Sequence, residues 1–127
     1  IFLVSPGKYE ENVFLPSYVS LIGEGPDNTI IKLTDGGSSL IDNSLIRLAS
    51  NSNIKNLKID IDANGKGNAT GIYSSNNNID IENVNIVDSG TSSTSNTIGI
   101  YLEDGTNNNI KSSDITFTLG IETCIGT

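Results

Sequence analysis

A repeat of short apolar segments, each interrupted by one asparagine, is the feature that most constrains how this 127-residue chain folds. Residues 54–59 read IKNLKI, and residues 81–86 read IENVNI 27 positions later. Residues 112–117, SSDITF, keep the type of the last four positions and predict a third copy 31 residues further on. Another asparagine lies five residues before Asn56, Asn83 and Asp114 in these copies: these are Asn51, Asn78 and Asn109.

The alternation inside each copy predicts a strand with a sharp bend. Leu57 and Ile59 alternate with polar residues, which indicates a half-buried strand. Ile54 lies an odd number of residues from Leu57, so a straight strand would point only one of them inward. Asparagine tolerates the left-handed backbone conformation that turns a chain in one residue. We therefore predict corners at Asn56 and Asn83.

Strands that bend and then continue in every repeat are typical of a parallel β-solenoid, whose coils stack at about 4.8 Å. Loops of variable length project from such a stack, and equivalent asparagines form hydrogen-bonded ladders along it. We expect an all-β fold with roughly four to five coils and a single domain over residues 1–127. Because the chain begins with IFLV rather than Met, we expect a mature product or a segment of a longer solenoid.

Composition excludes several functions. Fifteen Asp and Glu residues outweigh seven Lys and Arg residues, and the resulting net charge of −8 argues against nucleic-acid binding. The chain has no His, the commonest metal ligand and general base near neutral pH. No apolar stretch approaches the length of a membrane span.

Two stretches resemble a known superfamily. Residues 5–31, SPGKYEENVFLPSYVSLIGEGPDNTII, are similar to the opening coil of pectin methylesterase and pectate lyase superfamily domains, which share P-G-x-Y-x-E followed by L-x-G-x-G and T-x-I. Residues 56–73, NLKIDIDANGKGNATGIY, resemble their strand, glycine-rich loop and strand. The resemblance to the pectin lyase-like superfamily implies a single-stranded right-handed parallel β-helix. It implies no particular activity, because the superfamily contains lyases, hydrolases, esterases, epimerases and non-catalytic adhesins.

The catalytic sets of this superfamily are incomplete here, and we assign no catalytic residue. Pectin methylesterases use Gln and polygalacturonases use His, and the chain lacks both. Pectate lyases use an Arg base with acidic calcium ligands, so Arg47, the only arginine, keeps calcium-assisted β-elimination open as an alternative. An Arg can act as a base only if its very high pKa is locally overcome, and no neighbouring residue indicates this.

The segment DIDANG suggests a calcium loop. Asp60, Asp62 and Asn64, followed by Gly65, match the first half of an EF-hand loop. The twelfth position is Gly71 instead of Glu, and no helices flank the loop. We expect a turn without a cofactor, with Ca²⁺ as the alternative.

One outward row of side chains is the candidate binding site. The isoleucines at 46, 72 and 100 are expected to point inward, so the residues that follow them point outward. These residues are Arg47, Tyr73 and Tyr101, with Phe14 and Glu122 extending the series. Such a strip suits sugars, which have apolar faces and polar edges. The alternative is that tyrosines merely stabilise an exposed β surface. In the resembled family the cleft runs along this strand, the first of each repeat, and the loops after the third strand, which here are residues 62–70 and 88–97.

We therefore predict a secreted or cell-surface module that contacts a polysaccharide or cell-surface glycan without cleaving it. The acidic surface, rich in Asn, Ser and Thr, suits an extracellular location. The first alternative is a pectate lyase-like enzyme or a fragment of one. The second is a purely structural stalk, adhesin or fibre repeat that associates end to end through its exposed coil edges.

Overall fold

The fold is built from parallel β-strands. The structure, a computed structural model, describes residues 1–127 apart from 34–35, 40, 63–66, 91–95, 118–120 and 127. The described residues form thirteen strands and no helix, and every strand pair is parallel. An isolated antiparallel bridge joins Gly37 and Asn68. The predicted all-β class and parallel pairing are confirmed.

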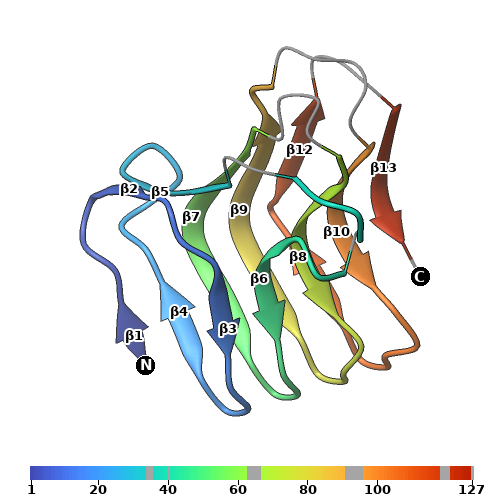
Figure 1. The fold of residues 1–127 in the computed structure, drawn as a ribbon. Helices are drawn as coiled ribbons and strands as arrows, with labels where there is room; N and C mark the ends of the chain where they lie inside the picture. The colour runs from blue at the N-terminus through green and yellow to red at the C-terminus, as the bar shows by residue number, and fades with distance from the viewer. Residues whose placement is uncertain (34–35, 40, 63–66, 91–95, 118–120, 127) are drawn as a thin grey trace.

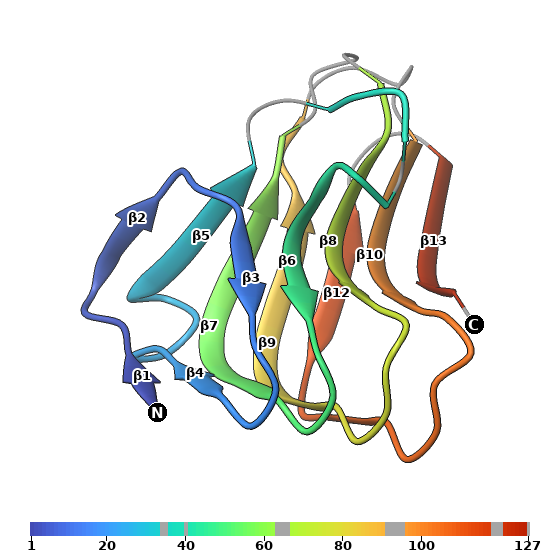
Figure 2. The ribbon, with the colours of Figure 1, turned by 60° about the horizontal axis from the view of Figure 1, so that its bottom comes forward.

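The strands fall into two sheets (Figures 1 and 2). The five-stranded sheet contains β3 (Val13–Leu15), β6 (Ser44–Leu48), β8 (Ala69–Ser74), β10 (Asn96–Leu102) and β13 (Ile121–Gly126), in that order. The eight-stranded sheet contains β1 (Phe2–Leu3), β2 (Gly7–Tyr9), β4 (Ser20–Ile22), β5 (Thr29–Leu33), β7 (Asn53–Ile61), β9 (Asp80–Asp88), β11 (Asn109–Lys111) and β12 (Asp114–Phe117).

The long strands β7 and β9 divide the eight-stranded sheet into two rows. The first half of β7 pairs with β4 and its second half with β5, while both halves pair with β9. Each turn of the chain therefore runs along one strand of the five-stranded sheet, then along the two rows of the other sheet, and returns one level further (Figure 2). This is the path of a parallel β-helix, with five levels in the five-stranded sheet.

The predicted asparagine corners are present. Asn56 and Asn83 have φ angles of 58° and 52°, and Asn83 Nδ2 donates a hydrogen bond to Asn56 Oδ1 at 2.9 Å. Asn51 and Asn78 repeat the arrangement at the other corner, with φ angles of 62° and 59° and an Nδ2 to Oδ1 distance of 3.0 Å. Two ladders of asparagines with left-handed backbone conformation thus connect successive levels, as predicted.

The predicted offset of the third copy is wrong by two residues. Ile81 pairs with Ile110 and Ile86 with Ile115, which is a step of 29 residues instead of 31. The third corner therefore falls at Ser112, which has a φ of 50°, and not at Asp114. Likewise, Asn107 takes the position expected for Asn109, with a φ of 56°. A shift of two residues preserves which side chains face inward, so alternation alone does not distinguish the two offsets.

The opening coils use a longer turn in place of the single-residue corner. Residues 23–28, GEGPDN, lie over the Asn56 carbonyl, which accepts a hydrogen bond from Gly25 N at 2.8 Å. A Cβ at Gly23 would collide with that same carbonyl, so only glycine allows this approach. The buried Thr29 completes the turn, because its Oγ1 accepts a hydrogen bond from Glu24 N at 2.9 Å.

Isoleucines and leucines fill the interior between the sheets. Ile54 and Leu57 are both fully buried despite their odd spacing, which is the expected consequence of the bend at Asn56. The isoleucines predicted to point inward from the five-stranded sheet are also fully buried, namely Ile46, Ile72 and Ile100. The core thus fixes which side chains of β6, β8 and β10 face outward.

Substitution of Asn83 separates the two contributions of the corner. Asn83→Gly keeps the left-handed backbone accessible and loses the side-chain hydrogen bond to Asn56, so we expect the free energy of unfolding to fall by about 1 kcal/mol. Asn83→Ala loses the same hydrogen bond and also places a residue that has a Cβ but no polar side chain in the left-handed conformation. It should lower the free energy of unfolding by about 1 kcal/mol more than Asn83→Gly. Urea denaturation measures both values. Equal losses would show that backbone conformation contributes nothing at this corner.

Candidate functional site

Strand pairing brings the predicted outward residues together in one row. Phe14 is in register with Arg47, Arg47 with Tyr73, and Tyr73 with Tyr101. These four residues, here called the outer strip, lie on β3, β6, β8 and β10, which are adjacent in the five-stranded sheet (Figure 1). The predicted alignment of the two tyrosines with Arg47 and Phe14 is therefore observed.

Glu122 does not continue the outer strip. In the pairing of β13 with β10, Glu122 is in register with Thr97, and Gly126 is in register with Tyr101. The sequence contains two isoleucines four residues apart in this strand, Ile121 and Ile125, and both have the inward phase. Alternation therefore allowed either residue to match Ile100, and the structure selects Ile125. The expected position of Glu122 in the strip is corrected accordingly.

The two tyrosines form the aromatic part of the outer strip. Their ring centroids lie 5.6 Å apart with an interplanar angle of 46°, within the range of favourable aromatic pairs. Both side chains are partly buried, whereas Phe14 is 68% exposed. The rings therefore leave apolar surface accessible on neighbouring levels of the β-helix.

Glu103 adds a carboxylate to this row. The Tyr73 hydroxyl donates a hydrogen bond to Glu103 Oε2 at 2.7 Å. Burial raises the pKa of Tyr73, and the hydrogen bond to Glu103 raises it further. The phenol therefore stays protonated near neutral pH and holds the carboxylate beside the rings. The sequence analysis missed Glu103, although its position two residues after Tyr101 gives it the same outward phase.

Arg47 is held by the segment that precedes β6. Its Nη2 donates to the carbonyl oxygen of Ile41 at 2.7 Å and lies 3.3 Å from Asp42 Oδ1. The Arg47 side chain is 37% exposed and the Asp42 side chain 79% exposed, so water screens this ion pair. The guanidinium nevertheless has a carboxylate partner of its own within the protein.

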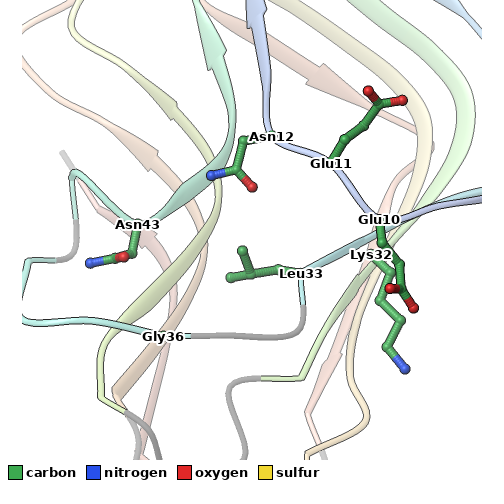
Figure 3. Close-up of a pocket in the computed structure, with 7 residues that line it drawn as sticks. All are labelled: Glu10, Glu11, Asn12, Lys32, Leu33, Gly36 and Asn43. Atoms are coloured by element: carbon green, nitrogen blue, oxygen red, sulfur yellow. The ribbon is translucent and has the colours of Figure 1, made fainter.

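A hollow of about 250 Å³ lies at the edge where the first strands of the strip begin (Figure 3). Asn12 and Asn43 line it, and they immediately precede β3 and β6. Glu10, Glu11, Lys32, Leu33 and Gly36 complete its lining. Lys32 Nζ lies 3.7 Å from Asp62 Oδ2, so this cation also has a partner. The hollow thus adds polar groups and exposed carboxylates to one edge of the outer strip.

The candidate calcium residues lie next to this cation. Asp60 Oδ1 and Asp62 Oδ1 are buried and have no hydrogen-bond partner, while the other oxygen of Asp62 faces Lys32. Asn64, the third predicted ligand, lies outside the described residues. Across the described part of the chain, no group of three or more His, Cys, Asp or Glu side chains is placed to hold a metal ion. Calcium binding stays a prediction.

The loops expected beside the strip are described only in part. Residues 63–66 and 91–95 lie outside the described residues. Next to those gaps, Asn96 Nδ2 donates to Asn68 Oδ1 at 2.9 Å, which links the starts of β8 and β10. In the described ranges no helix has the length and apolar character needed to cross a membrane.

Parallel strands stacked in levels, with aligned outward side chains, define the class of protein as a parallel β-helix. A family model described as rhamnogalacturonase A/epimerase, pectate lyase-like, matches residues 2–125. The chain therefore belongs to this family, and the pectin lyase-like resemblance seen in the sequence is confirmed. No curated protein and no solved structure matches the chain.

The Tyr73–Glu103 contact predicts a distinctive ionisation. In an ultraviolet titration of the four tyrosines, Tyr73→Phe should remove a phenol with a pKa above the usual value of about 10. Glu103→Gln should move that ionisation to lower pH, because the carboxylate charge opposes the phenolate.

The same shift predicts a change in stability with pH. A raised pKa stabilises the folded protein fully below the unfolded pKa of about 10, and this contribution is lost as pH rises through the folded value. The free energy of unfolding should therefore fall more steeply above pH 10 in the wild type than in Tyr73→Phe. Identical slopes would contradict the assignment.

Proposed function

We propose that this β-helix binds polysaccharide along the outer strip and does not cleave it. The observation that carries the proposal is the Tyr73–Tyr101 pair, held on adjacent levels with ring centroids 5.6 Å apart. Aromatic faces suit the apolar C–H faces of sugar rings, while polar groups at the ring edges suit sugar hydroxyls. Glu103 and Arg47 supply such groups within or beside the row.

Family membership supports a polysaccharide ligand. The matching family is named for rhamnogalacturonase and pectate lyase-like proteins, and its model covers residues 2–125. This establishes a polysaccharide-related β-helix module, while the choice of binding over cleavage rests on the strip itself. The acidic net charge of −8 and the many Asn, Ser and Thr residues favour a place outside the cell or on its surface.

The contacts of Arg47 favour binding over catalysis. In a lyase mechanism Arg47, the only arginine of the chain, would have to act as the base that takes a proton from the sugar. Its guanidinium instead donates to Ile41 O and pairs with Asp42. A pectate lyase-like reaction is kept as the enzymatic alternative, with release of unsaturated, ultraviolet-absorbing sugars as its signature.

Removal of both rings tests the binding proposal. Tyr73→Ala/Tyr101→Ala should weaken polysaccharide retention about tenfold, because stacking contacts contribute about 0.5–1.5 kcal/mol each. Affinity gel electrophoresis with a panel of soluble polysaccharides measures the change. Tyr18→Ala is the matched control, since Tyr18 is 82% exposed and lies outside the strip.

The alternatives give different results in the same experiment. Unchanged retention with lower stability would show that the tyrosines serve only the sheet. An increase in ultraviolet absorbance during incubation with the polymers would establish the lyase reaction instead.

An open apolar end favours the structural alternative as a second candidate. Phe2 and Leu3 are 60% and 75% exposed, and they line a hollow of about 470 Å³ together with other residues of the opening strands. Among the described strands, β1, β2 and β3 stand at the ends of their rows, and each is paired along one edge only. These features favour end-to-end self-association of the β-helix.

Self-association predicts a mass that rises with concentration. Sedimentation velocity of the wild type should show oligomers that Phe2→Ser/Leu3→Ser reduces, because the variant removes apolar surface from this end. A wild type that stays monomeric at every concentration would exclude the structural alternative.

A further inference from the structure

We infer that the outer strip selects uncharged polysaccharides and disfavours polyuronates. This inference rests on the proposed function and specifies the class of ligand. Its basis is the distribution of charged groups along the strip and in the adjoining hollow, where carboxylates are exposed and the cations are already paired.

The cations of the site have partners within the protein. Arg47 Nη2 lies 3.3 Å from Asp42 Oδ1, and Lys32 Nζ lies 3.7 Å from Asp62 Oδ2. A polyuronate carries carboxylates along its chain and is bound by cations that are free to pair with them. A polyuronate that contacted Arg47 or Lys32 would have to share that cation with a carboxylate of this protein. Among the described residues, the strip and hollow offer no unpaired cation.

Carboxylates surround the path that a bound chain would follow. Glu103 lies beside the tyrosines, and the Asp42 side chain is 79% exposed beside Arg47. Glu10 and Glu11 are exposed at the hollow. The carboxylates of Glu10, Glu11 and Glu103 repel an anionic polymer, and the net charge of −8 adds to the effect. A neutral polymer meets no such repulsion.

The same carboxylates suit a neutral sugar chain. A carboxylate offers about four acceptor positions, of which the Tyr73 hydroxyl uses one on Glu103. Sugar hydroxyls are donors, and a hydrogen bond to an ionised acceptor is stronger than one between neutral groups. The strip therefore combines apolar ring faces with charged acceptors, which match a neutral polyol.

Two polymers of different charge test the inference. Polygalacturonate and its fully methyl-esterified form share a backbone, and the ester removes the carboxylate charge. We expect the wild type to bind the ester at least tenfold more tightly at low salt in a titration with immobilised protein. The difference should narrow in concentrated salt, because exposed charges are then screened.

Charge variants locate the effect. Glu103→Gln and Asp42→Asn should each strengthen binding of polygalacturonate severalfold, since the first removes a repelling charge and the second frees Arg47. Glu82→Gln is the matched control: it changes net charge equally, but Glu82 pairs with Lys55 at 3.0 Å on the eight-stranded sheet. If Glu82→Gln strengthened binding of polygalacturonate equally, the effect would come from the net charge of the protein, and the inference would be overturned.

The outcomes also separate this inference from the proposed function. Tighter binding of polygalacturonate than of its ester would overturn the inference and leave polysaccharide binding intact. If the wild type binds neither these polymers nor neutral galactans and xylans, the proposed function fails and the inference fails with it. Tyr73→Ala/Tyr101→Ala should weaken binding of the ester, which ties the preference to the strip.

Discussion

The left-handed bend at Asn56 and Asn83 is the constraint on which the rest of the structure depends. It lets Ile54 and Leu57 point into the same interior although they are three residues apart. The 2.9 Å hydrogen bond between the side-chain amides of the two asparagines holds equivalent corners in register. Once successive levels are aligned at the corners, the strands between them are aligned as well. The row from Phe14 to Tyr101 is therefore a consequence of the corners, as much as of the strands that carry it.

Period-two alternation made the fold and most of the strip predictable. It identified the inward isoleucines and hence the outward Arg47, Tyr73 and Tyr101, all of which the structure aligns. It failed for Glu122 and for the third corner, where the predicted residues miss the observed positions by an even number of residues. Alternation repeats every two residues, so it fixes the phase of a strand and leaves its register open by such steps. Loop lengths decide the register, and they follow no period.

Contacts between levels that involve residues outside the repeat were not predictable from the sequence. Tyr73 and Glu103 are 30 residues apart, and their hydrogen bond depends on where β10 ends relative to β8. The hollow beside the strip is lined by three separate segments, which come together only after the chain has completed one full turn of the β-helix. Asp42 lies only five residues before Arg47, but their contact was not predicted either, because the intervening turn determines the side-chain direction.

The extent of the strip follows from the same stacking. Within residues 1–127, each level from β3 to β10 contributes one residue to this register position, from Phe14 to Tyr101, and Gly126 in the next level has no side chain. Three intervals of about 4.8 Å separate these four residues, so they span roughly 14 Å, the length of a short stretch of a polymer. Few contacts give a modest binding free energy, and repulsion by one or two carboxylates is then a large fraction of it. If the strip binds polysaccharide as proposed, we therefore expect charge, more than shape, to determine which polymer it retains.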